Sequence, residues 1–167
     1  MNIPTNNNQP EAHADGNASH AFAVLGQFLQ DDGWYPHKLD EKTVYRVGFS
    51  GKNGNYTCFA VVRIDLQQFM FYVQSGVKAA PEARTAVAEF LTRANYGLRI
   101  GNFELDMSDG EVRYKSSLDF EGVTLSPQLI KNAIYPAVQT MDRYFAGLLQ
   151  VMYGQSTPAD ALALIEG

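Results

Sequence analysis

The stretch that decides the fold spans residues 96–115 and reads YGLRIGNFELDMSDGEVRYK. At its centre, Asp109-Gly110 supplies two residues that accept a positive φ, which is typical of a two-residue hairpin turn. Apolar and polar residues alternate on both sides of this turn. We therefore predict an antiparallel hairpin in which Ser108 lies opposite Glu111.

This register assigns the remaining cross-strand pairs of the hairpin. It places Met107 opposite Val112, Leu105 opposite Tyr114 and Phe103 opposite Ser116 on one face, and Asp106 opposite Arg113 and Glu104 opposite Lys115 on the other. The first set is apolar and the second pairs opposite charges. One face of the hairpin is thus expected in the core and the other in water.

The totals favour one globular domain in a reducing compartment. The chain has 167 residues, of which 46% are hydrophobic, and this is enough for one sizeable core without a metal or disulfide. The single cysteine, Cys58, lies in a strand-like run and is expected to be a buried hydrophobe. A net charge of −5 with scattered basic residues argues against nucleic-acid binding.

The N-terminal composition predicts a disordered tail at residues 1–17, with two prolines and five asparagines. This stretch lacks the basic start and apolar run of a secretory signal, and the chain lacks the roughly 18 consecutive apolar residues of a membrane span. We expect a cytoplasmic protein. A first helix is predicted from Ser19 to Gly33, and Trp34 after it is expected to anchor the following loop.

Three strand-like runs follow the first helix, at residues 44–49, 56–65 and 69–73. Short turns separate them, which is typical of an antiparallel meander. The second and third runs carry apolar residues on both faces. The reverse face presents Phe59, Val61, Met70 and Tyr72, and an apolar patch of that kind indicates a partner or a second layer. These four residues are our candidate partner-binding site.

Helical spacing returns from Pro81 to Gly97, and again in a long run that Ser126-Pro127 begins. Pro136 interrupts that long run and predicts a kink or local break. Thr157 resembles a cap for a last short helix or docked tail at residues 156–167. The order α-β-β-β-α-β-β-α predicts an α+β domain at residues 18–155, with an antiparallel five-stranded sheet and helices packed mainly on one face.

The search for chemistry finds no catalytic set, cofactor motif or metal motif. His13, His20 and His37 are expected to be surface residues. Asp142 and Arg143 are neighbours and point about 100° apart on a helix. We expect separate partners for these two charges and no charge relay.

Six segments carry a family resemblance: residues 29–34 (LQDDGW), 95–98 (NYGL), 101–104 (GNFE), 109–113 (DGEVR), 142–145 (DRYF) and 151–154 (VMYG). With the element order, they resemble the YbjN-domain family, also described as bacterial sensory transduction regulators, over residues 19–155. The resemblance implies a fold like that of the small type III secretion chaperones. It implies no established reaction, metal or ligand.

The favoured interpretation is a non-enzymatic YbjN-like protein, chaperone-like or regulatory, that binds another polypeptide. The alternative is a small-ligand-binding protein or an enzyme with a pocket between the last long helix and the sheet. The apolar stripe of that helix, which includes Ile134, Val138, Met141, Phe145, Leu148 and Met152, is wide. It predicts a homodimer that pairs through this helix or through the reverse face of the sheet.

Overall fold

The computed structural model describes residues 11–40 and 42–167. It contains helices α1 (Glu11–Asp31), α2 (Arg84–Gly97), α3 (Pro127–Met152) and α4 (Pro158–Glu166), a short 3-10 helix η1 (Pro81–Ala83), and strands β1 (His37–Lys38), β2 (Val44–Ser50), β3 (Asn55–Arg63), β4 (Gln68–Lys78), β5 (Asn102–Leu105) and β6 (Glu111–Asp119). The strands form one antiparallel sheet in the order β1-β2-β3-β4-β6-β5. The predicted α+β class and antiparallel sheet are confirmed.

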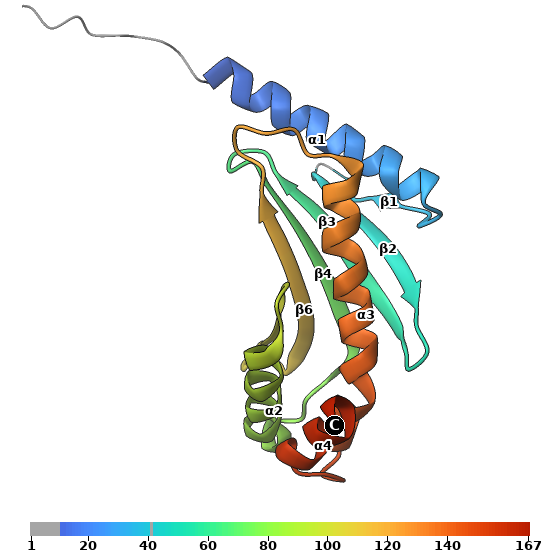
Figure 1. Ribbon diagram of the computed structural model, residues 1–167, viewed down its shortest axis with the longest axis vertical. Coiled ribbons are helices and arrows are strands. Elements are labelled where there is room, and N and C mark those ends of the chain that lie inside the picture. Colours follow the sequence, from blue (N-terminus) through green and yellow to red (C-terminus); the bar gives the residue numbers. More distant parts are fainter. Residues whose placement is uncertain (1–10, 41) are drawn as a thin grey trace, which may run out of the picture.

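Helix α3 runs across one face of the sheet, with α1 across one end and α2 and α4 gathered at the other (Figure 1). The two predicted helix N-caps, Ser126 for α3 and Thr157 for α4, are confirmed. The Ser126 side chain accepts a hydrogen bond from the Leu129 amide at the start of α3, and Thr157 does the same for Asp160 at α4. The last predicted helix therefore exists and packs against α2 and α3.

The core lies between α3 and the sheet face that it covers. This face presents Val47, Cys58, Ala60, Val62, Phe69, Phe71, Val73, Val112 and Tyr114, all buried. Trp34 is also buried, edge-on to Phe71 at 6.2 Å between ring centroids, and its indole N–H donates to Asp32. The predicted anchor role of Trp34 is confirmed.

The sheet has six strands, so the predicted five were one too few. The additional strand, β1, contains only His37 and Lys38, which pair with Arg46 and Tyr45 of β2. Two residues after a proline are too short to show the alternation that marks a strand in a sequence. Strand β1 is defined only by its pairing with β2 in the folded sheet.

The hairpin between β5 and β6 forms, but the predicted register was wrong by two residues. Leu105, and not Met107, lies opposite Val112, and Glu104 lies opposite Arg113. A shift of two leaves every side chain on its predicted face, because strand side chains alternate with a period of two. Met107 moves into the loop and is exposed.

A local hydrogen bond explains the longer turn. The Asp106 carboxylate accepts from the Ser108 amide at 2.8 Å, so the chain begins to turn before Asp109. The Gly110 amide then donates to the Asp106 carbonyl at 2.8 Å, and Gly110 has φ +83°. The predicted positive φ of Gly110 is confirmed within a four-residue loop, but the positive φ predicted for Asp109 was wrong, because the longer loop does not require it.

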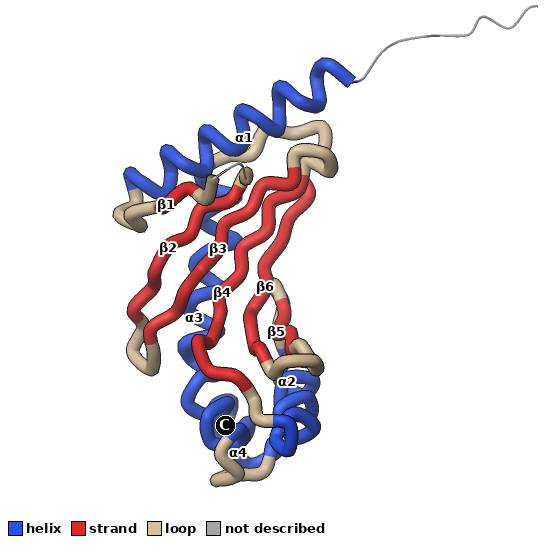
Figure 2. The backbone as a smooth tube through the Cα atoms, turned by 180° about the vertical axis from the view of Figure 1, so that it is seen from behind, coloured by secondary structure: helices blue, strands red, loops and turns tan. Residues whose placement is uncertain are grey.

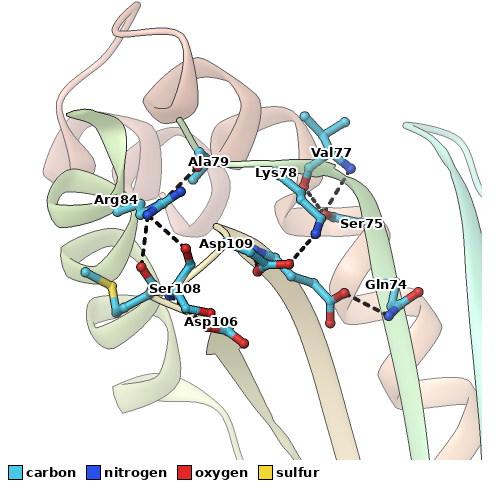
Figure 3. A network of polar contacts seen from close by, with 11 residues as sticks. Gln74, Ser75, Val77, Lys78, Ala79, Arg84, Asp106, Ser108 and Asp109 are labelled. Atoms are coloured by element: carbon cyan, nitrogen blue, oxygen red, sulfur yellow. Dashed lines mark hydrogen bonds and ion pairs between the residues drawn. The ribbon is translucent and has the colours of Figure 1, made fainter. Parts of the chain in front are cut away.

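This loop is fastened to the end of β4 and the start of α2 (Figure 3). Arg84 donates to the carbonyl oxygens of Met107 and Ser108 at 3.0 and 3.3 Å, and Lys78 forms an ion pair with Asp109. The register of β4 against β6 shifts between Gln74 and Lys78, where β4 bulges. The bulge brings the end of β4 over the loop, which fixes both segments.

Three expectations for the helices need correction. Helix α1 begins at Glu11 instead of Ser19, so residues 11–17 of the predicted tail belong to it, and residues 1–10 lie outside the described residues. Helix α3 continues through Pro136, so the alternative of a local break was wrong, and the alternative of a kink stays a prediction. The apolar stripe of α3 is buried within the one chain, including Val138 and Met141, so the argument for a dimer through this helix loses its basis.

Candidate protein-binding face

The four predicted partner-binding residues come together on the sheet face opposite α3. Phe59 lies directly opposite Tyr72, and Val61 directly opposite Met70, on the adjacent strands β3 and β4. All four side chains are partly exposed. In Figure 2 the strands that carry them lie in front of α3, so α3 does not cover this face. We call these four residues the reverse-face patch.

The patch is ordered by its own contacts. The Tyr72 hydroxyl donates to the Met70 sulfur at 3.2 Å, and the Arg113 guanidinium lies over the Tyr72 ring, 4.5 Å from its centroid. Such a cation–π contact contributes about 0.5–1 kcal/mol at an exposed site. The Tyr72 side chain is therefore held by contacts with both Met70 and Arg113.

Charged residues border the patch on both sides. Arg46 of β2 lies opposite Phe59, and Lys115 of β6 lies opposite Tyr72. Glu104 forms ion pairs with Lys115 and, at 2.7 Å, with Arg113. Burial acts to raise the pKa of Glu104, but hydrogen bonds and charges from Lys115 and Arg113 outweigh it and hold that pKa below its usual value. On the β6 side of the patch, the two cations Arg113 and Lys115 are thus both paired with Glu104.

A hollow of about 350 Å³ adjoins the patch over β4 and β6. Its lining consists of Gln68, Met70, Tyr72, Lys115, Ser117, Leu118 and Asp119. Met70 and Tyr72 of the patch line the hollow together with polar residues of its border. A hollow of this composition could accept an apolar side chain that has polar groups on either side. The sequence predicted that Lys115 lies on the solvent-exposed face of the hairpin, but it did not place this residue beside the patch. The alternation along β6 was the pattern that could have indicated this position.

The other candidate groups do not assemble a reactive site in the described part of the chain. Cys58 is fully buried on the core face, and burial raises the pKa of its thiol to about 12, so it stays protonated and unreactive. His20 and His37 are exposed as predicted, and the side chain of His13 lies outside the described part of the chain. No group of three His, Cys, Asp or Glu side chains that could hold a metal ion occurs among the described residues.

Asp142 and Arg143 have separate partners, as predicted. The Asp142 carboxylate accepts from the amides of Lys52 and Asn53 at 2.9 and 2.8 Å, and from the Tyr56 hydroxyl at 2.9 Å, so it holds the β2–β3 loop. Arg143 donates to the Ile165 carbonyl at 2.9 Å. Burial opposes ionisation of Asp142, but these donors prevail and lower its pKa. The role of Asp142 is structural.

The family follows from comparison with known proteins. The family model YbjN, described as a putative bacterial sensory transduction regulator, matches residues 22–150. The chain belongs to the YbjN family. No curated protein matches it in sequence. None of the helices in the described part of this YbjN-family chain combines the length and apolar character that a membrane span requires.

Solved structures show the same fold at low identity. The crystal structure of YbjN, a putative transcription regulator from E. coli, has a TM-score of 0.56 and 13% identity, and the match covers 79% of this chain and 89% of that one. A chain from the ExsC–ExsE complex has a TM-score of 0.53 and 12% identity, with coverages of 77% and 93%. The HopA1–SchA chaperone–effector complex, at 18% identity, superposes too loosely to support a comparison, with a TM-score of 0.44.

Proposed function

We propose that this YbjN-family chain is a non-enzymatic, chaperone-like or regulatory module that binds another polypeptide in the bacterial cytoplasm. The observation that carries the proposal is the reverse-face patch, a group of cross-strand apolar pairs on a sheet face that α3 leaves open. Contiguous exposed apolar residues with a polar border are typical of protein–protein contact sites.

A polypeptide suits this surface better than a small molecule. The patch lies on a sheet face formed by adjacent strands, and the lining of the neighbouring hollow includes the charged residues Lys115 and Asp119. Aromatic residues and arginine are enriched where proteins bind proteins, and here Tyr72 and Arg113 are in contact. The fold likeness to a chain from the ExsC–ExsE complex, a complex of two proteins, supports the same interpretation.

Neither alternative from the sequence gains support from a specific contact. The middle of α3, including Ile134 and Met141, is fully buried against the core, which argues against a ligand pocket between this helix and the sheet. A homodimer through α3 would need an exposed apolar stripe on this helix, and that stripe is buried within the one chain. Homodimerisation through the reverse-face patch remains a proposal, and the experiment below tests it alongside partner binding.

The test replaces Phe59 and Tyr72 together by Thr, which removes the apolar pair and keeps a residue type that favours strands. The wild type and the double variant are expressed in a bacterial host, purified gently, and compared by mass spectrometry of bound polypeptides and by sedimentation velocity. We expect the variant to lose a defined polypeptide, or the self-association, that the wild type retains. The matched control is Thr57→Ser with Gln74→Thr, the next cross-strand pair on the same face.

The outcomes separate binding from folding. If the wild type carries no polypeptide and is monomeric, or if the double variant binds as the wild type does, the proposal is wrong. Should the double variant unfold, Val61→Thr introduces a hydroxyl into the patch with almost no change of shape. Loss of stability in that variant would show that the patch is part of the core.

A further inference from the structure

A second recessed surface, with a lining separate from the reverse-face patch, lies between α1 and the segment that leads into α3. Figure 1 shows this segment running beside α1. The Asn17 side-chain amide donates to the Val123 carbonyl at 3.2 Å, which ties the two together. Between them is a groove of about 520 Å³, lined by His20, Val24, Gln27, Phe28, Asp31, Asp32, Thr124, Leu125, Ser126 and Pro127. We call it the α1–α3 groove.

The walls of the groove are mainly apolar. Phe28 and Leu125 belong to the buried core and line the groove together with Val24 and Pro127. The described residues that line it include no Lys or Arg, and its acidic groups are Asp31, the last residue of α1, and Asp32, which follows it. The groove thus has an apolar wall and an anionic end.

The anionic end conflicts with the electrostatics of α1. Backbone carbonyls give the C-terminus of a helix a partial negative charge, which favours cations there. The last turn of α1 has no basic residue and carries Asp31. Asp32 is stabilised by hydrogen bonds from the Trp34 indole at 2.9 Å and the Tyr135 hydroxyl at 2.7 Å. Within residues 11–40 and 42–167, Asp31 receives one side-chain hydrogen bond, from Gln27 at 2.8 Å, and is exposed.

We propose that the α1–α3 groove binds a small organic cation with an apolar body. Its volume lies within the roughly 300–1,000 Å³ that small-molecule sites occupy. Two short segments provide the whole lining, which suits a small molecule better than a polypeptide. The apolar body lies along Val24, Phe28 and Leu125, and the cationic group lies at Asp31. There it relieves the conflict at the end of α1. This site is independent of the proposed partner binding.

The chain contains its own reporter for this site. Trp34 is the only tryptophan, and its indole donates to Asp32 at the anionic end. Phenylbutylamine, the neutral phenylbutanol and the anionic phenylpentanoate share one apolar body and differ in charge. We expect saturable changes of Trp34 fluorescence at low ionic strength, with affinity in the order amine, alcohol, acid. Added salt should weaken the binding of the amine, strengthen that of the acid and leave the alcohol unchanged.

Two variants assign the charge selectivity. Asp31→Asn keeps an acceptor for Gln27 and removes the charge, so amine affinity should fall about two- to fivefold, as expected for an exposed ion pair, with alcohol affinity unchanged. Glu89→Gln makes the same change of net charge on α2, where Glu89 pairs with Arg93, and should change neither affinity. If Trp34 is silent, amide NMR spectra of Thr124 and Leu125 provide the readout. Absence of saturable binding, an amine no tighter than the alcohol, or equal effects of the two variants would overturn the proposal.

Discussion

Gly110 is a position at which a single methyl group should greatly lower stability. Its φ of +83° is unfavourable for any residue with a Cβ, and a Cβ built there would lie 2.0 Å from the Ala79 carbonyl oxygen. That oxygen belongs to backbone, which cannot rotate away as a side chain can. The Ala79 amide also donates to the Gly110 carbonyl at 2.8 Å, so the two segments cannot separate without breaking this bond.

The expected loss for Gly110→Ala combines these two effects. The left-handed backbone costs roughly 1–2 kcal/mol for an L-residue. Moving the chain away from Ala79 forfeits a hydrogen bond with a net contribution of about 0.5–1.5 kcal/mol. We therefore expect a decrease of about 1.5–3.5 kcal/mol in the free energy of unfolding. Urea denaturation followed by Trp34 fluorescence measures it directly.

Gly122→Ala is the matched control. Gly122 has a similar φ of +75°, but nothing lies within 4 Å of the position that the added methyl group would occupy. This variant should lose only the backbone contribution, roughly 1–2 kcal/mol. If the two substitutions cost the same, the close approach of Gly110 to Ala79 does not stabilise the protein. The conclusion that contacts with β4 hold the β5–β6 loop in place would then be wrong.

Three further predictions test other contacts. Asp142→Asn should lose about 1.5–3 kcal/mol at pH 7, because hydrogen bonds to a charged acceptor are lost. Since the pKa of Asp142 is lowered in the folded protein, the difference in stability between wild type and variant should be full above the unfolded-state pKa and should disappear as the pH falls through the folded-state pKa. Urea denaturation at several pH values measures this difference. A difference that does not change with pH would contradict the prediction. Phe103→Ala should cost about 3–5 kcal/mol and Lys115→Ala at most about 1 kcal/mol, and equal losses would refute the assignment of the two hairpin faces. Cys58 should not react with a thiol reagent at pH 8 until the protein unfolds, and fast labelling of the native protein would show that it is accessible.

The hairpin shows which part of the fold could be predicted from sequence. Alternation assigned its residues to faces correctly, because that assignment depends only on parity along each strand. The register depended on where the turn begins, and the hydrogen bond from the Ser108 amide to Asp106 moved that point. An Asp two residues before a Ser is a local signal for such a turn, but Asp109-Gly110 was the stronger pattern. The strand β1 carried no local signal of its own.

The two candidate sites differ in how far sequence can define them. The pairs Phe59–Tyr72 and Val61–Met70 follow from one short turn between β3 and β4, so the patch could be proposed before the structure was known. The α1–α3 groove needs α1 and residues 124–127 to meet across most of the chain. No pattern within either segment contains that information.

The border of the patch illustrates the same limit from within the sheet. Strands β4 and β6 are neighbours, but the chain between them forms α2 and β5, so no turn fixes their register. Only that register places Lys115 opposite Tyr72 and brings Arg113 over its ring. Glu104 of β5 then holds both cations through ion pairs. The apolar centre of the candidate site is therefore a local property of β3 and β4. Its charged border arises only when the whole sheet has formed, and in the proposed binding role it would affect partner selectivity more than affinity.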